Sequence, residues 1–236
     1  MQMSILCTIC ARSGSKEIRN KAIQKISNMP LIAYSIRQAI KSKIFDRVIL
    51  STDSKKIQKI GKYYGAESFF LRPKKLSKDN VPKLKVIKHA HQAAEKFFNK
   101  KFDICVDLDV TSPLRLVTDI KRSVKKFQST GCDNLFTVTK ANKNPYFNQV
   151  EYKDKNLQIV KKSKKRINTR QAAPNVYDMN ASIYIFRRSF LIKKNKVINT
   201  KTKIFLMPRE RSIDIDDKFD LCLVKLLLKN EKKLSK

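Results

Sequence analysis

The segment from residue 5 to residue 16 joins an apolar run to a small, polar and basic loop. The run reads Ile-Leu-Cys-Thr-Ile-Cys, and the loop reads Ala-Arg-Ser-Gly-Ser-Lys. A short apolar run that ends at a Gly/Ser cluster predicts a buried β-strand. The small residues at 13–15 let backbone N–H groups approach a ligand, while Arg12, Lys16 and Lys21 bring positive charge.

A strand that feeds such a loop at the carboxyl edge of a parallel sheet is where α/β proteins bind nucleotides. The spacing matches neither the Gly-x4-Gly-Lys-Ser/Thr pattern nor Gly-x-Gly-x-x-Gly. A basic surface loop in a lysine-rich protein would show the same residues, and this segment alone leaves both interpretations open.

Strand-like and helix-like patterns alternate along the 236 residues, which predicts βαβ units, a parallel sheet and one α/β domain. Apolar residues recur at helical spacing near 30–42, 57–64, 84–98, 117–127 and after 217. Apolar runs of strand length lie at 48–53, 69–71, 104–110, 134–139, 177–186 and 204–207. His91 falls on the apolar helical stripe, so we expect a histidine in or at the edge of the core and not a catalytic residue. The segment between 140 and 177 is less regular, and a hairpin is expected around 154–156.

The formal charge is +33, from 53 basic and 20 acidic residues. Such charge favours nucleic acid electrostatically, but the basic residues are spread along the chain, and only residues 161–166 form a cluster. We therefore expect solvated lysines and no specific nucleic-acid partner. No run approaches a membrane span and no signal peptide is visible, which predicts a cytoplasmic protein. Cys7 and Cys10 are expected to be inert thiols of the first strand.

Two acidic pairs are candidates for chemistry. Asp107 and Asp109 share one face of a predicted strand, and a buried carboxylate pair needs cations or donors, which favours Asp109 lying in a site. Asp214 and Asp216 point the same way along an extended segment, about 7 Å apart. That pair suits a hard divalent cation that also binds phosphates. Alternatively, Asp216 or Asp217 caps the helix that follows.

Five motifs together resemble those of the acylneuraminate cytidylyltransferases (CMP-sialic acid synthetases), over nearly the whole chain. The motifs are Ala11-Arg12-Ser13-Gly14-Ser15-Lys16 with Lys21, the 72–79 segment that opens Arg-Pro, Thr111-Ser112-Pro113-Leu114-Arg115, the strand after Asn180, and Ser212-Ile213-Asp214-Ile215-Asp216. Thr169-Arg170-Gln171 also resembles the Arg-Gln segment of that family. The family has Gln-Pro where this chain has Asp109-Val110, which looks more like the bacterial legionaminic (nonulosonic) acid branch.

The chain departs from the family pattern at other positions. The family usually has Asn at the position of Ala22, and small hydroxyl residues shortly after Asp79, where this chain reads Asn80-Val81-Pro82-Lys83. The family more often has Gly at the position of Ala181.

The resemblance implies a three-layer α/β/α nucleotide-diphospho-sugar transferase (Rossmann-like) fold with a mostly parallel sheet, residues 1–236 forming one domain and residues 140–177 a protruding dimerisation arm. It implies transfer of CMP from CTP to a nonulosonic acid such as sialic or legionaminic acid, with release of pyrophosphate, by a homodimer. A cytidylyltransferase for the eight-carbon acid Kdo, another sugar nucleotidyltransferase, and a basic nucleic-acid-binding protein are the alternatives. The motif 111–115 argues against the Kdo branch.

The resemblance also assigns roles to residues. Arg12 and Lys21 would be catalytic, and Mg²⁺, with Mn²⁺ as a substitute, would bind Asp214 and Asp216. No general base is evident. The expected nucleotide-binding residues are Ala11, Arg12, Ser13, Gly14, Ser15, Lys16, Lys21, Arg72 and Asp79. The expected sugar-binding residues are Asp109, Thr111, Ser112, Arg170, Gln171, Tyr177 and Asn180.

Overall fold

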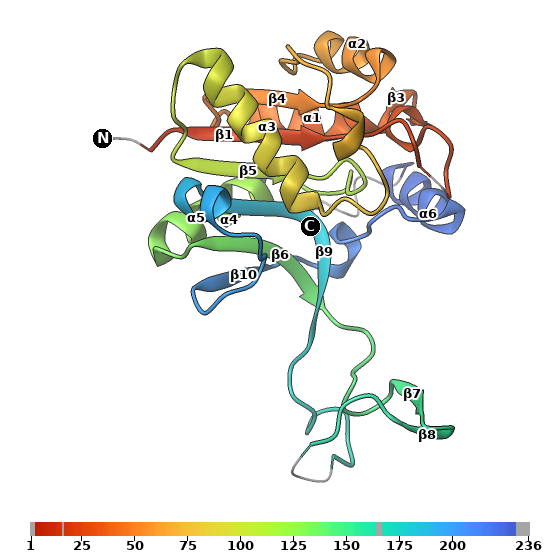
Figure 1. The fold of residues 1–236 in the computed structure, drawn as a ribbon. Coiled ribbons are helices and arrows are strands. Elements are labelled where there is room, and N and C mark those ends of the chain that lie inside the picture. Colours follow the sequence, from red (N-terminus) through yellow and green to blue (C-terminus); the bar gives the residue numbers. More distant parts are fainter. Residues whose placement is uncertain (1–2, 16, 164–166, 230–236) are drawn as a thin grey trace.

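The computed structural model describes residues 3–15, 17–163 and 167–229 and has a six-stranded sheet at its centre (Figure 1). The strand order is β10–β6–β9–β5–β1–β4, and only β9 runs antiparallel to its neighbours. The predicted mostly parallel sheet is therefore confirmed. The strands are β1 (Ile5–Cys10), β4 (Arg47–Ser51), β5 (Ile104–Leu108), β6 (Asn134–Lys140), β9 (Tyr177–Arg187) and β10 (Thr202–Leu206).

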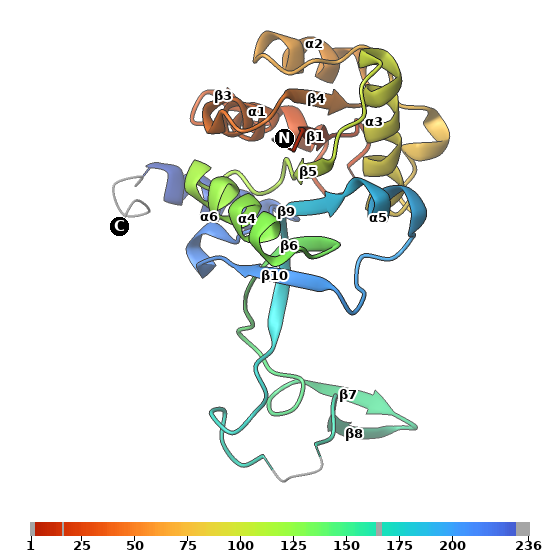
Figure 2. The same cartoon turned by 90° about the vertical axis from the view of Figure 1, so that its left-hand side faces the viewer.

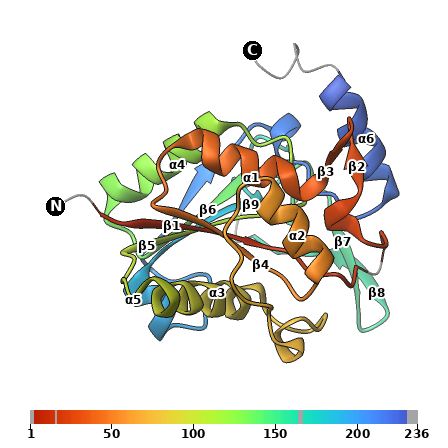
Figure 3. The same cartoon turned by 90° about the horizontal axis from the view of Figure 1, so that it is seen from above.

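Helices cover both faces of this sheet, which gives the three-layer fold (Figure 3). On one face lie α1 (Leu31–Ser42) and α4 (Val117–Thr130), which also pack on each other. On the other lie α3 (Lys83–Phe98) and the short α5 (Arg188–Lys193). Helix α2 (Lys55–Tyr63) packs beside β4, and α6 (Lys218–Lys229) ends the described chain. None of the helices in the described part is long and apolar enough to cross a membrane.

The buried side chains follow the periodicities of the sequence. Strand β5 is buried at all five positions, as expected for a parallel strand that is covered on both faces. In α1, Leu31, Ile32, Ile36 and Ala39 are buried, and they form the stripe that faces the sheet. His91 is fully buried in α3, so of the two predicted positions, in the core or at its edge, the structure shows the first.

A long excursion leaves the body between β6 and β9 (Figures 1 and 2). It carries a two-stranded hairpin of β7 (Val150–Lys153) and β8 (Asn156–Ile159), joined through Asp154 and Lys155. Both turn residues have positive φ, 49° and 67°, as a two-residue hairpin turn requires. The hairpin expected around 154–156 is therefore confirmed.

The strand predicted at 69–71 does not form, and that prediction was wrong. Glu67 instead makes a single bridge with Ile49, and its N–H and C=O bond the backbone of β4 over 2.8 Å each. The aromatic rings that suggested a strand pack on α3, where Phe69 stacks on Phe97 with ring centroids 3.9 Å apart. Two short strands, β2 (Lys25–Ile26) and β3 (Met29–Pro30), and three 3-10 turns, η1 (Lys21–Ile23), η2 (Lys74–Leu76) and η3 (Arg209–Arg211), complete the elements.

Strand β9 contains an irregularity opposite Thr137. The pairing register with β6 shifts between Phe136 and Val138, and Ala181 has φ 52°. The Thr137 hydroxyl donates to Asn180 Oδ1 over 2.6 Å and accepts from the N–H of Ile183 over 2.9 Å. A left-handed conformation at Ala costs free energy that Gly would avoid, so the Ala at this position stores strain in β9.

Candidate active site

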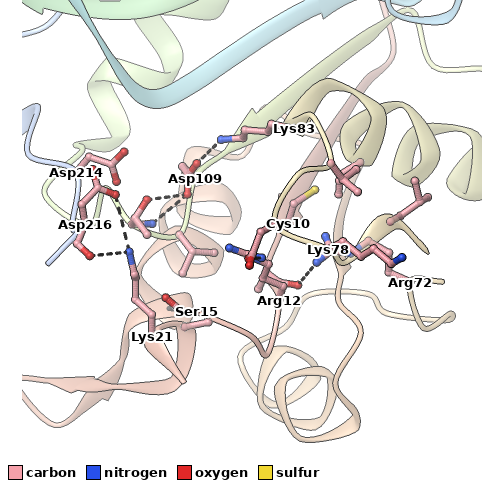
Figure 4. Close-up of a pocket in the computed structure, with 18 residues that line it drawn as sticks. Cys10, Arg12, Ser15, Lys21, Arg72, Lys78, Lys83, Asp109, Asp214 and Asp216 are labelled. Carbon is pink, nitrogen blue, oxygen red and sulfur yellow. Dashed lines mark hydrogen bonds and ion pairs between the residues drawn. The ribbon is translucent and has the colours of Figure 1, made fainter. Parts of the chain in front are cut away.

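A cavity of about 360 Å³ lies at the carboxyl edge of β1 and β5, where the topology predicts a ligand site (Figure 4). The loop after β1, the segment before α3, the end of β5 and the segment before α6 all contribute to its wall. It is lined by Cys10, Ala11, Arg12, Ser15, Lys21, Ala22, Arg72, Leu76, Lys78, Asp79, Val81, Lys83, Val86, Asp109, Val110, Thr111, Asp214 and Asp216.

The loop after β1 is held by the end of β4. Asp53 accepts hydrogen bonds from the backbone N–H of Ser13 over 2.8 Å and from its hydroxyl over 3.0 Å. The cap of α2 is Ser54, whose hydroxyl accepts from the N–H of Ile57. Asp53 therefore positions the loop and does not cap the helix. A Cβ added at Gly14 would meet open space, which leaves room for a ligand against the loop backbone.

Cations line the side of the cavity formed by this loop and by residues 72–79. Arg12 forms an ion pair with Asp79, and Lys78 lies beside them (Figure 4). Arg72 is only 5% exposed, and its guanidinium donates to Ala11 O over 2.9 Å and to Ser77 Oγ over 3.2 Å. Arg72 thus fixes the β1 loop while it lines the cavity, whereas the contact of Arg12 found among the described residues is a surface ion pair.

Lys21 ties the N-terminal loop to the segment that precedes α6. Its ammonium donates to Ile215 O over 2.6 Å and lies 3.9 Å from Asp216 Oδ1. Ile215 is fully buried, and its N–H donates to Thr111 O over 2.9 Å. These contacts seat the segment on the end of the sheet and set the place of the two carboxylates on either side of Ile215.

Asp214 and Asp216 both face the cavity, as their alternate spacing predicts (Figure 4). Asp214 Oδ1 is buried and, within the described residues, has no hydrogen-bond partner. Burial, with the negative charge of Asp109 adding to it, raises the pKa of Asp214 to about 6. A buried carboxylate oxygen without a donor is suited to a cation, whereas the carboxylate of Asp216 is 81% exposed.

The capping alternative applies to Asp217. Its carboxylate accepts from the N–H of Asp220 over 2.9 Å, and Asp220 in turn accepts from the N–H groups of Asp216 and Asp217. The carboxylates of Asp214 and Asp216 are thus left for other partners. Across the described ranges, no group of three or more His, Cys, Asp or Glu side chains could hold a metal ion. A cation on this pair would therefore need further ligands from a substrate.

Lys83 supplies the cation that the Asp107–Asp109 pair needs. Its ammonium forms an ion pair with Asp109 Oδ2, lies 3.3 Å from Asp107 Oδ2 and stands 4.7 Å from the centre of the Tyr184 ring. Burial alone would lower the pKa of Lys83, but attraction to Asp109 and Asp107 outweighs it and raises the pKa. Asp109, which the sequence favours as a site residue, lines the cavity, whereas Lys83, which also lines it, was not among the sequence candidates. The sequence signal for Lys83 was indirect: the predicted buried pair Asp107 and Asp109 required a cation, but nothing in the sequence said which lysine supplies it.

The carboxylates of Asp107, in β5, and of Asp109, just after it, differ in environment. Burial raises the pKa of Asp107, which accepts from the Thr8 hydroxyl over 2.7 Å. Burial would also raise the pKa of Asp109, but Lys83 and the hydrogen bonds from Thr111 lower it overall. The N–H of Thr111 donates to Asp109 Oδ1 over 3.1 Å and its hydroxyl over 2.9 Å. Asp109 is therefore a fixed, charged acceptor at the cavity wall.

Buried residues of the 111–115 motif hold the backbone that carries Asp109. Arg115 is 1% exposed and donates to Ser182 O over 2.6 Å, to Ser35 Oγ over 2.8 Å and to Asp109 O over 3.2 Å. Burial lowers the pKa of Arg115 to about 10. Ser112 is also fully buried, and its hydroxyl donates to Asn180 O. Arg115 and Ser112 therefore hold the end of β5 against β9.

Several predicted site residues lie away from the cavity. Ser112 and Asn180 are buried beneath it, and neither forms part of its lining. Arg170 and Gln171 line a separate cavity of about 320 Å³ at the base of the arm, where Arg170 donates to Asn142 O. Tyr177 is exposed at the start of β9. Lys16 lies outside the described residues.

The thiols of β1 have different surroundings but a common property. Cys7 is fully buried, while Cys10 lines the cavity. Burial, with the charge of Asp107 adding to it, raises the pKa of both thiols well above its usual value. All five cysteines are free, in keeping with the inert thiols that the sequence predicts.

A three-layer α/β domain with a cationic loop and a carboxylate pair at the carboxyl edge of its sheet has the architecture of a nucleotide-binding transferase. The family model described as "Cytidylyltransferase" matches residues 6–234, and the chain belongs to this family of nucleotidyltransferases.

Curated relatives agree with this assignment. The chain is 44% identical over 224 residues to the CMP-N,N'-diacetyllegionaminic acid synthase of Campylobacter jejuni, covering 95% of this chain and 94% of the relative. It is 43% identical over 227 residues to post-translational flagellin modification protein B of Campylobacter coli, covering 96% of each. A pseudaminic acid cytidylyltransferase of Campylobacter jejuni is 31% identical over 228 residues, covering 96% of this chain and 97% of the relative.

Solved structures share the fold at low identity. A CMP:2-keto-3-deoxy-manno-octonic acid synthetase complexed with CTP has a TM-score of 0.70 at 14% identity, over 97% of this chain and 99% of that one. A 4-diphosphocytidyl-2C-methyl-D-erythritol synthase of Anaerococcus prevotii has a TM-score of 0.67 at 12% identity, over 96% and 99%. These likenesses confirm the fold class.

Proposed function

We propose that this chain transfers CMP from CTP to a nonulosonic acid of the legionaminic or sialic type and releases pyrophosphate. The anomeric hydroxyl of the acid attacks the α-phosphorus, the bond from that phosphorus to the β-phosphate oxygen breaks, and the hydroxyl proton is released. The observation that carries the proposal is one cavity with cations on one wall and Asp214 and Asp216 on another. The names of the relatives at 31–44% identity supply the class of acceptor.

The cationic wall suits the triphosphate. Arg12 from this wall and Lys21 from the side of Asp216 would bind phosphate oxygens, and the backbone of residues 11–15 would approach them closely. Arg12 pairs with Asp79 in the structure, so the incoming phosphates would compete with that carboxylate. Arg72 would act by holding Ala11 in place. Positioning and charge neutralisation are the main contributions of a protein to phosphoryl transfer.

Asp214 and Asp216 would hold Mg²⁺, or Mn²⁺ in its place. The fit rests on Asp214 Oδ1, a buried acceptor without a donor in the described part of the chain, and on the hard oxygen ligands of both residues. A divalent ion there would neutralise the transferring phosphates. Lys21, which already lies 3.9 Å from Asp216, would help to balance the charge on the same side.

Asp109 and Thr111 would contact the acceptor acid from the cavity wall. Arg170, Gln171 and Tyr177 lie at the base of the arm and not in this cavity. We propose that the arm pairs with a second copy, so that these residues complete the partner's site. Deleting the hairpin 150–159 would then convert a dimer into a monomer in sedimentation velocity. A full-length protein that sediments as a monomer at all concentrations would contradict the dimer.

A panel of acceptors tests the proposed reaction. Wild-type protein, CTP and Mg²⁺ are mixed with nine-carbon acids (legionaminic, pseudaminic and N-acetylneuraminic) or with the eight-carbon Kdo, and pyrophosphate release is measured. We expect turnover with at least one nine-carbon acid and little with Kdo. Turnover with Kdo alone would support the alternative enzyme class, and no turnover with any acid would contradict the proposal. Because CTP is a cytoplasmic metabolite, the proposed reaction implies a cytoplasmic enzyme.

A further inference from the structure

Lys83 places a positive charge in the cavity away from the β1 loop. It is the first residue of α3, and its side chain, 34% exposed, reaches the end of β5 (Figure 4). There it meets Asp109 and Asp107, and the Tyr184 ring lies beside it. Lys83 and Asp109 both line the cavity, so a ligand can reach this ion pair.

The pair has bonding capacity left for a ligand. An ammonium has three N–H donors, and the described contacts of Lys83 direct it to Asp109 and Asp107, which leaves one donor. Asp109 Oδ1 already accepts both hydrogen bonds from Thr111, whereas Oδ2 meets only Lys83 among the described residues. Since a carboxylate oxygen accepts about two hydrogen bonds, one acceptor remains on Oδ2. The cavity wall thus offers one donor and one acceptor side by side.

Charge decides what kind of group fits there. Lys83 faces two carboxylates, so the three side chains do not offer a net positive charge to an anion. A hydroxyl is neutral, and its single oxygen can accept from the ammonium and donate to the carboxylate. A secondary amide fits less well, because its N–H and C=O point in opposite directions and cannot both reach adjacent partners.

We propose that Lys83 and Asp109 form a hydroxyl-recognition pair, in which Lys83 donates to a sugar hydroxyl and Asp109 Oδ2 accepts from it. The inference rests on the proposed function for the identity of the sugars. Two ligands of that reaction carry hydroxyls, namely the ribose of the nucleotide and the acceptor acid. In this account Lys83 contributes to specificity, and it is more than a counter-ion for Asp107.

The test measures how wild type and a Lys83 variant bind ligands that each lack a single hydroxyl. Binding is measured by calorimetry in two series of ligands. One compares CTP with 2′-deoxy-CTP and 3′-deoxy-CTP. The other compares N-acetylneuraminic acid with its 4-, 7-, 8- and 9-deoxy analogues in the presence of a non-hydrolysable CTP analogue. The proteins are wild type, Lys83→Met and the control Lys85→Met, which makes the same change at an exposed position of α3 outside the cavity.

A hydrogen bond to a charged partner corresponds to about 10- to 100-fold in affinity. We therefore expect wild type and Lys85→Met to prefer one hydroxyl-bearing ligand by that factor, and Lys83→Met to prefer it by less than about threefold. If the preference is lost only among the CTP analogues, the pair binds a ribose hydroxyl. If it is lost only among the acid analogues, the pair binds a hydroxyl of the acceptor. A preference that Lys83→Met keeps unchanged in both series, or the absence of any preference in wild type, would overturn the proposal.

Removing Lys83 leaves two carboxylates without their cation, so Lys83→Met can fail to fold. The double variant Lys83→Met/Asp107→Asn removes that repulsion and serves for the same comparison. Its hydroxyl preference should be lost as well, whereas Asp107→Asn alone should keep it. Because binding and not turnover is measured, failure of the proposed transfer reaction and failure of this pair give different results: the first abolishes pyrophosphate release in wild type, and the second leaves the hydroxyl preference intact in Lys83→Met.

Discussion

Arg12 and Lys21 both reach the cavity from the connection after β1, but their surroundings differ. Arg12 is held by a surface ion pair with Asp79, and such pairs contribute about 0–1 kcal/mol to stability. Arg12→Ala should therefore leave the melting temperature nearly unchanged. If Arg12 neutralises phosphate in the transition state, kcat/KM for CTP should fall about 10²- to 10³-fold, by analogy with a lost oxyanion donor.

Steady-state kinetics and thermal melting check this prediction. Arg19→Ala, an exposed position on the same connection outside the cavity, is the matched control and should behave as wild type. Lys21→Ala should lower kcat/KM similarly, but it should also loosen the segment around Ile215, which Lys21 binds. Normal kinetics in Arg12→Ala would remove Arg12 from the phosphate site.

Asp214 carries a pH-dependent prediction. Burial raises its pKa to about 6, so the carboxylate is charged above that pH and becomes protonated as the pH falls through it. Protons and a divalent cation then compete for the same oxygen. The Mg²⁺ concentration for half-maximal activity should therefore rise steeply as the pH falls from 7 to 5. An Asp carboxylate with an ordinary pKa would stay ionised over this range.

Substitutions separate this metal role from helix capping. Asp214→Asn and Asp216→Asn keep the shape but lose the charge, so activity should collapse and recover in part at high Mg²⁺ or with Mn²⁺. Asp217→Asn is the control, because Asn caps a helix as well as Asp does. Full activity in an Asp214→Asn/Asp216→Asn double variant would contradict the metal assignment.

At the scale of elements, Ala181 tests how much strain β9 holds. Its φ of 52° is unfavourable for a residue with a Cβ atom. Ala181→Gly removes that strain, although Gly loses more conformational entropy on folding. We expect a net gain of about 0.5–1 kcal/mol, which raises the melting temperature by about 1–4 °C in a chain of this size. The control Ala172→Gly should not raise it, and a lower melting temperature in Ala181→Gly would contradict the account.

The elements that the sequence predicts well are those with strong periodicity. The helices near 30–42 and 84–98 are found within about a residue of the predicted bounds, whereas the strand predicted at 104–110 begins as expected but ends at Leu108. The Phe69-Phe70-Leu71 run misled because its rings pack on α3, a tertiary contact that no local pattern encodes. The same holds for strand order, since β9 enters between β5 and β6 from far along the chain.

The predicted site residues that line the cavity come from local motifs, whereas cavity residues with partners distant in sequence were not predicted. The β1 loop and the 214–216 pair could be read as single segments. Lys83 could not, because it lies 26 residues from Asp109, its partner in the fold, and looks like any other lysine of a lysine-rich chain. The sequence also does not distinguish Asp216 from Asp217 as the helix cap. In the structure the carboxylate of Asp217 accepts from the N–H of Asp220, and Asp220 accepts from the N–H groups of Asp216 and Asp217.

For the whole molecule, the charge of +33 calls for its own measurement. If it reflects solvated lysines, nucleic acid should bind without sequence preference at physiological salt, with Kd about 10⁻⁴–10⁻⁶ M, and the affinity should fall steeply with added salt. Fluorescence anisotropy with several DNA and RNA oligonucleotides checks this. Nanomolar binding to one defined sequence would indicate a nucleic-acid function that the cavity does not explain.

The central claim is that the cavity at the carboxyl edge transfers CMP and not another part of CTP. ³¹P NMR of wild-type protein with CTP, Mg²⁺ and the preferred acid follows every phosphorus at once. We expect the three CTP resonances to give way to one phosphodiester resonance and pyrophosphate, with no CDP, and Asp214→Asn/Asp216→Asn to prevent the change. CDP and inorganic phosphate as the products, or unchanged CTP with every acid of the panel, would contradict it.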